Sequence, residues 1–99
     1  MTMTGLNRPN AGSRSGIHIA TIAYDGRIWS VHLEFYDDPK RPEVYLARLK
    51  FDVANPTDYE EAPRTAVIII EETFEDAISK ARDFDDHQLE GLLRSALTI

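Results

Sequence analysis

Three histidines are the side chains in this chain best suited to proton transfer or metal binding: His18, His32 and His87. A metal or acid–base site would need at least two of them to converge with a carboxylate. The hairpin register derived below sends His18 and His32 to opposite faces of a sheet, and His87 is distant in sequence from both. We therefore expect no histidine ligand site, no metal and no cofactor.

The acidic side chains and possible nucleophiles do not form a familiar catalytic pattern. Asp83-Phe84-Asp85-Asp86 resembles the opening of a calcium loop, but Gln88 and Arg94 stand where that loop has glycine and glutamate, so helix capping explains it better. The chain has no cysteine, no Gly-x-Ser-x-Gly elbow and no glycine-rich phosphate loop. We expect the protein not to be an enzyme. A cleft in which Glu71 acts as an acid with a raised pKa is the enzymatic alternative.

A few cations could contact nucleic acid. Arg48 and Lys50 are predicted on the outward face of one strand, with Lys40 and Arg41 in the loop before it and one aromatic, Tyr36, beside them. Such a surface can track a single-stranded backbone while a base stacks. The net charge of −6 and the pI near 4.9 disfavour this function, so nucleic-acid binding is the alternative hypothesis and not the leading one.

The residues from Ile17 to Tyr36 predict the hairpin that positions these groups. Asp25-Gly26 favours a two-residue type I′ turn, in which both central residues have φ > 0. Without a bulge, the register then pairs Ala20 with Val31 and His18 with Leu33. It divides the side chains into a core face and an outer face. The predicted core face carries Ala20, Ile22, Tyr24, Trp29, Val31, Leu33 and Phe35.

The rest of the chain predicts two more strands and two helices. Residues 43–52 alternate between apolar and polar side chains, and residues 65–70 form a continuous β-branched run. Thr73 begins one amphipathic helix with a capping pattern, and Asp85 or Asp86 caps a second that carries a leucine stripe. We predict an α+β fold, in which two C-terminal helices pack on one face of a four-stranded, meander-like antiparallel sheet.

The outer face of this sheet is more apolar than a solvated face should be. One side of residues 65–70 adds to it, either Val67 and Ile69 or Ala66, Ile68 and Ile70. Contiguous exposed apolar side chains mark interaction sites, and a two-fold homodimer is the commonest solution. We expect a homodimer, with an unidentified protein partner as a further possibility. The predicted interface residues are Ile17, Ile19, Ile28, Val44 and Leu46.

Two segments are loosely similar to small HicB-type antitoxin domains: Tyr-Asp-Gly-Arg-Ile-Trp-Ser-Val and Thr-Phe-Glu-Asp-Ala-Ile-Ser-Lys-Ala. The resemblance covers about a third of the chain and implies a regulatory nucleic-acid-binding role. The chain lacks the Pro-Gly-Cys-like segment of those domains and has a long strand in its place. The order of four strands and a helix also resembles Whirly-type single-strand binders, whose lysine-rich signature is absent. We assign no family.

Length and composition complete the prediction. The 99 residues suffice for one domain, residues 17–99, preceded by a polar N-terminal arm of residues 1–16 that we expect to be disordered. No stretch is long and apolar enough for a membrane span, and the N-terminus lacks the apolar region of a secretory signal. With no cysteine, the chain is expected to be cytoplasmic and not membrane-bound.

Overall fold

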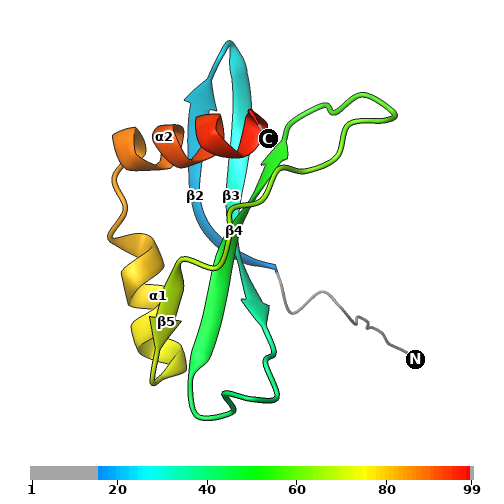
Figure 1. Cartoon of the computed structure of the whole chain (residues 1–99). Helices are drawn as coiled ribbons and strands as arrows, with labels where there is room; N and C mark the ends of the chain where they lie inside the picture. The colour runs from blue at the N-terminus through cyan, green and yellow to red at the C-terminus, as the bar shows by residue number, and fades with distance from the viewer. Residues whose placement is uncertain (1–15, 99) are drawn as a thin grey trace, which may run out of the picture.

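A computed structural model describes residues 16–98, and the predicted arm lies outside the described residues except for Gly16. The strands are β2 (Ile17–Tyr24), β3 (Arg27–Tyr36), β4 (Tyr45–Val53) and β5 (Ile69–Glu71), followed by helices α1 (Phe74–Arg82) and α2 (Asp86–Leu97) (Figure 1). The sheet order is β2-β3-β4-β5, and each neighbouring pair is antiparallel. The predicted α+β fold, a four-stranded antiparallel sheet followed by two helices, is therefore confirmed.

The hairpin between β2 and β3 turns at the predicted residues. Asp25 and Gly26 both have positive φ, 54° and 75°, as a type I′ turn requires. Tyr24 pairs with Arg27 on either side of this turn, and the register continues as predicted as far as Ala20 opposite Val31.

The register prediction is wrong beyond Ala20, because a bulge interrupts β2. Between Ala20 and His18 the register shifts, so that His18 pairs with His32 and Ile17 pairs with Leu33. An odd separation of five residues would put Ile17 and Ile22 on opposite faces of a regular strand. The extra residue of the bulge, Ile19, lets both isoleucines contact the core.

The last strand is shorter than the predicted run of residues 65–70. Regular pairing is confined to β5, and an isolated bridge joins Arg64 to Lys50 upstream of it. Between them, the Thr65 hydroxyl accepts a hydrogen bond from the backbone N–H of Leu49 at 3.0 Å. The N–H of Leu49 is thus bonded to a side-chain oxygen, whereas in a continuous strand pairing it would donate to a backbone carbonyl. The irregular segment still follows the edge of β4.

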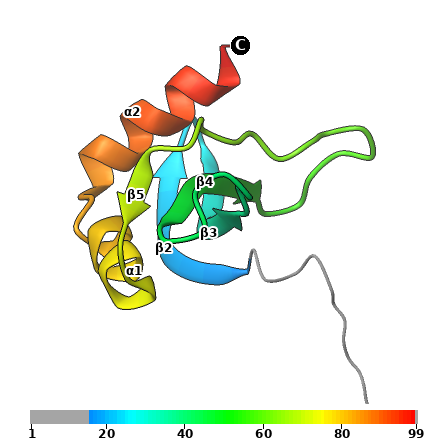
Figure 2. The same ribbon diagram turned by 60° about the horizontal axis from the view of Figure 1, so that its bottom comes forward.

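Both helices begin at side-chain caps predicted from the sequence. Thr73 accepts the N–H of Asp76, and Asp85 forms a reciprocal capping box with Gln88. The sheet curls, and both helices lie on its inner side (Figure 2). The core between these layers is apolar and fully buried, with the following members: Val31, Leu33, Ala47, Leu49, Phe51, Ile69, Ala77, Ala81, Leu89 and Leu93.

Candidate functional site

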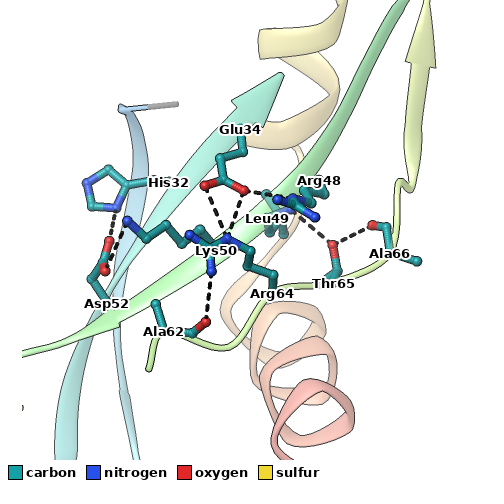
Figure 3. Close-up of polar contacts among 10 residues, drawn as sticks. All are labelled: His32, Glu34, Arg48, Leu49, Lys50, Asp52, Ala62, Arg64, Thr65 and Ala66. Carbon is teal, nitrogen blue, oxygen red and sulfur yellow. Dashed lines mark hydrogen bonds and ion pairs between the residues drawn. The ribbon is translucent and has the colours of Figure 1, made fainter. Parts of the chain in front are cut away.

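The outer sheet face, which is turned away from the helices, has charged side chains at its centre. Glu34 on β3 is directly opposite Arg48 on β4. Arg48 Nε donates to Glu34 Oε1 at 2.7 Å, and Arg64 Nε donates to both carboxylate oxygens at 3.0 and 3.2 Å (Figure 3). Only 7% of Glu34 is exposed. We call these three residues the ionic cluster.

The backbone beside β4 brings Arg64 to this cluster. The Phe51 N–H donates to the Pro63 carbonyl at 3.0 Å, and the Thr65 N–H donates to the Leu49 carbonyl at 2.9 Å. These bonds flank Arg64 and hold it at the sheet edge, from which its side chain reaches across β4 to Glu34 (Figure 3). The sequence analysis did not identify Arg64. Its position directly before a β-branched run was the available signal, since a strand-edge arginine can reach a carboxylate on the same face.

The electrostatics of the ionic cluster keep Glu34 charged. Burial acts to raise the pKa of Glu34, but hydrogen bonds from Arg64 and Arg48 and their Coulombic attraction outweigh burial, and the pKa is lowered from its ordinary value of 4.5. An ionised carboxylate between two guanidinium groups is therefore the state at neutral pH. Both arginines consequently already have an anionic partner within the protein.

The four residues predicted for nucleic-acid contact fall into two settings. Arg48 belongs to the ionic cluster, and Lys50 Nζ lies 3.5 Å from Asp52 Oδ1. Lys40 and Arg41 are exposed in the connection between β3 and β4. Phosphate binding by Arg48 or Lys50 would have to compete with an intramolecular carboxylate.

The bulge brings two histidines together on the outer face, contrary to the sequence prediction. His18 and His32 are directly opposite, and their ring centroids are 5.6 Å apart with an interplanar angle of 68°. His32 Nδ1 lies 3.0 Å from Asp52 Oδ2, and His18 Nε2 lies 2.9 Å from Thr21 Oγ1. Each ring therefore has an oxygen neighbour at one of its two nitrogens.

The bulge also changes where the predicted apolar interface residues lie. Ile17 and Ile19 are partly buried and pack against the core, so they do not form part of an open outer patch. Ile28 is 50% exposed near the hairpin turn, and Val44 is half-buried just before β4. Leu46 is on the outer face but only 6% exposed. The five predicted interface residues thus do not form one surface.

An apolar stripe does cross the outer face at the opposite end from the hairpin turn. Tyr36, Leu46 and Ile70 are consecutive register partners on β3, β4 and β5, so their side chains share a face. Tyr36 and Ile70 are 54% and 48% exposed, and Ile68, just before β5, is 37% exposed. Ile69 is fully buried, which selects the Ile68 and Ile70 side of this segment as the outer one. We call Tyr36, Leu46, Ile68 and Ile70 the apolar stripe.

A hollow of about 340 Å³ adjoins the stripe at the connection between β3 and β4. Tyr36 and Leu46 line it together with Val44, and its polar lining includes Asp37, Asp38 and Arg41. The apolar surface at this end is therefore indented and not flat.

The remaining candidates for chemistry are possible metal ligands and Glu71. In residues 16–98, no group of three or more histidine, aspartate and glutamate side chains is placed to hold a metal ion. Glu71 lies 3.6 Å from Lys80 Nζ, as an ordinary ion pair would. None of the helices in this part of the chain has the length and apolar character needed to cross a membrane.

No protein-family model, curated protein or solved structure matches the chain.

Proposed function

We propose that this protein acts through protein–protein contact and forms a homodimer through the outer sheet face, with the apolar stripe at the centre of the interface. The exposure of Tyr36 and Ile70, which flank Leu46 in one register line, is the observation that carries the proposal. Adjacent exposed apolar side chains on a soluble domain favour burial against a partner. We also propose that the protein is not an enzyme and that it is located in the cytoplasm.

The charge distribution favours a second copy as the partner. The whole chain has a net charge of −6, yet the ion pairs of the outer face involve three cations and two carboxylates: Arg48, Lys50, Arg64, Glu34 and Asp52. Two copies of this face would not repel each other as two acidic surfaces would. A two-fold arrangement, in which the same patch meets itself, can set carboxylates of one copy against cations of the other.

Sedimentation velocity over a range of concentrations tests the proposal. We expect the wild type to be dimeric and the double variant Tyr36→Glu/Ile70→Glu to be a folded monomer, because both side chains are already half exposed. Ile19 and Leu46 are unsuitable targets, since charges there would disturb a packed environment. Leu97→Glu is the matched control, because Leu97 is 46% exposed on α2 and not on the outer face.

Three results would contradict the proposal. A wild type that stays monomeric at high concentration would exclude the homodimer. A double variant that stays dimeric would place the interface elsewhere, and a Leu97→Glu monomer would move it to the helices.

The alternative, a nucleic-acid-binding module that uses Lys40, Arg41, Arg48 and Lys50, has less support because two of the four cations have carboxylate partners. It would be supported by single-strand binding that weakens steeply with salt and with Arg48→Glu.

A further inference from the structure

We propose that His18 and His32 form a two-histidine site for a late first-row divalent transition metal, with Zn²⁺ as the reference ion. The site does not depend on the proposed dimer. Imidazole nitrogens are preferred ligands of Zn²⁺, Cu²⁺ and Ni²⁺, whereas Mg²⁺ and Ca²⁺ prefer oxygen. The two rings lie on adjacent strands as direct register partners, so the backbone already holds them in proximity.

The spacing of the rings suits joint coordination. With a metal–nitrogen distance of about 2.0–2.1 Å, two imidazoles on one tetrahedral ion have centroids roughly 5 Å apart. The observed separation is 5.6 Å. The two rings are thus close to the separation that one shared ion requires, and the exposed position of His18 leaves its ring room to turn toward the ion.

Each ring has an oxygen near one nitrogen, so that nitrogen can carry the proton while the other nitrogen binds the metal. Histidines that ligate metals usually donate their second ring N–H to a carboxylate, carbonyl or water. Thr21 Oγ1 lies 2.9 Å from His18 Nε2 and is such an acceptor, and Asp52 Oδ2 lies 3.0 Å from His32 Nδ1, where it would accept a hydrogen bond after a small turn of the ring. This arrangement leaves His32 Nε2 and His18 Nδ1 with the free lone pairs that coordinate the ion.

His32 Nδ1 lies close to a carboxylate but lacks a well-aligned hydrogen bond to it. This nitrogen is buried from solvent and has no well-aligned hydrogen bond, although Asp52 Oδ2 is 3.0 Å away. A buried nitrogen in that state calls for a physical explanation. Metal binding at Nε2 would fix the proton on Nδ1 and turn the ring so that Asp52 accepts it.

The charges near the site are compatible with a dication. Lys50 is the register partner of His32 on β4, but its ammonium lies 3.5 Å from Asp52 Oδ1, which offsets its charge. The protein supplies two ligands, so water or another small ligand completes the coordination shell. This open coordination predicts reversible chelation and not a structural metal centre.

Calorimetric titration of the folded protein with ZnCl₂ tests the proposal, with MgCl₂ as the control ion. We expect one Zn²⁺ site in the wild type, no site in His18→Ala or His32→Ala, and 10–100-fold weaker binding in Asp52→Asn, as is typical when an outer-shell partner is lost. His87→Ala is the matched control, because His87 is exposed on α2 and should leave binding unchanged.

Several outcomes would overturn the site. These are a wild type that binds no Zn²⁺, binding that survives either His18→Ala or His32→Ala, and binding that disappears in His87→Ala. Circular dichroism of each variant separates lost binding from lost folding, and His18 is exposed, so His18→Ala should remain folded. The Tyr36→Glu/Ile70→Glu variant should bind Zn²⁺ as the wild type does, which distinguishes failure of this site from failure of the dimer.

Discussion

Replacing Glu34 by glutamine is the sharpest test of how the outer face is stabilised. The substitution keeps the shape of the side chain but removes the charge that Arg48 and Arg64 share. Charge-assisted hydrogen bonds contribute about 1.5–3 kcal/mol each, and removing one partner of a buried ion pair costs about 3–5 kcal/mol. The two arginine side chains are 36% and 38% exposed, so water replaces part of the lost interaction. We expect Glu34→Gln to lower the free energy of unfolding by about 2–3 kcal/mol.

Urea unfolding measures this loss directly. Trp29 is the single tryptophan and only 3% exposed, so its fluorescence reports the opening of the core. The matched control is Glu60→Gln, which removes the charge of the carboxylate that accepts hydrogen bonds of 2.7 and 3.0 Å from Arg27 and is more exposed than Glu34. Circular dichroism serves as the second probe, because Arg27 lies 5.7 Å from the Trp29 ring centroid. Equal losses in the two variants would refute the special role assigned to Glu34.

The pH dependence of the stabilities of the wild type and Glu34→Gln tests whether the charge of Glu34 causes the loss. The pKa of Glu34 is lowered in the folded state, so its ionisation stabilises the fold above its ordinary pKa of 4.5. That contribution is lost as the pH falls through the lower folded-state pKa. The difference in unfolding free energy between wild type and Glu34→Gln should therefore be constant near neutral pH and shrink below about pH 4. A difference that does not change with pH would mean that packing, and not charge, explains the loss.

Substitutions at three further positions test local structure in the same urea series. Gly26→Ala should lower stability by about 1–2 kcal/mol, because φ at this position is 75°; an unchanged midpoint would contradict the type I′ turn. Gly91→Ala should raise stability by up to about 1 kcal/mol, since the added methyl meets only Arg94 Nη2 at 4.0 Å; a loss would reveal crowding in α2. Thr73→Ala should cost about 1 kcal/mol by removing the cap of α1, and Thr73→Ser should restore most of it.

The parts of the fold that were predictable from the sequence depend on local chemistry. The Asp25-Gly26 turn and the caps at Thr73 and Asp85 each involve residues within a few positions of one another. The bulge at Ile19 is different, because it depends on which side chains the helices bury. A hint was present in the odd separation of Ile17 and Ile22, since two isoleucines at that spacing can reach one core only through an irregular strand.

The candidate site was less predictable because its parts come from distant segments. Arg64 is thirty residues from Glu34, and only the pairing of residues 63–65 with the edge of β4 brings them together. The predicted strand at residues 65–70 was compatible with a contact between Arg64 and Glu34. The pattern of apolar residues, however, does not indicate which carboxylate a long arginine side chain reaches. Ile70 was one of two options for the outer side, and the burial of Ile69 decided between them.

The bulge gives the two sides of the ionic cluster different chemistry. By turning Ile17 toward the core and pairing His18 with His32, it puts an imidazole pair beside Asp52, where a regular strand would place isoleucine side chains on the outer face. The apolar stripe at the other end is unaffected, because Tyr36 and its partners lie beyond the ionic cluster. A regular β2 would have put Ile17 and Ile19 on the outer face beside the charged side chains of β3 and β4. We therefore expect self-association at the apolar stripe and metal binding at the imidazole pair, on opposite sides of the ionic cluster.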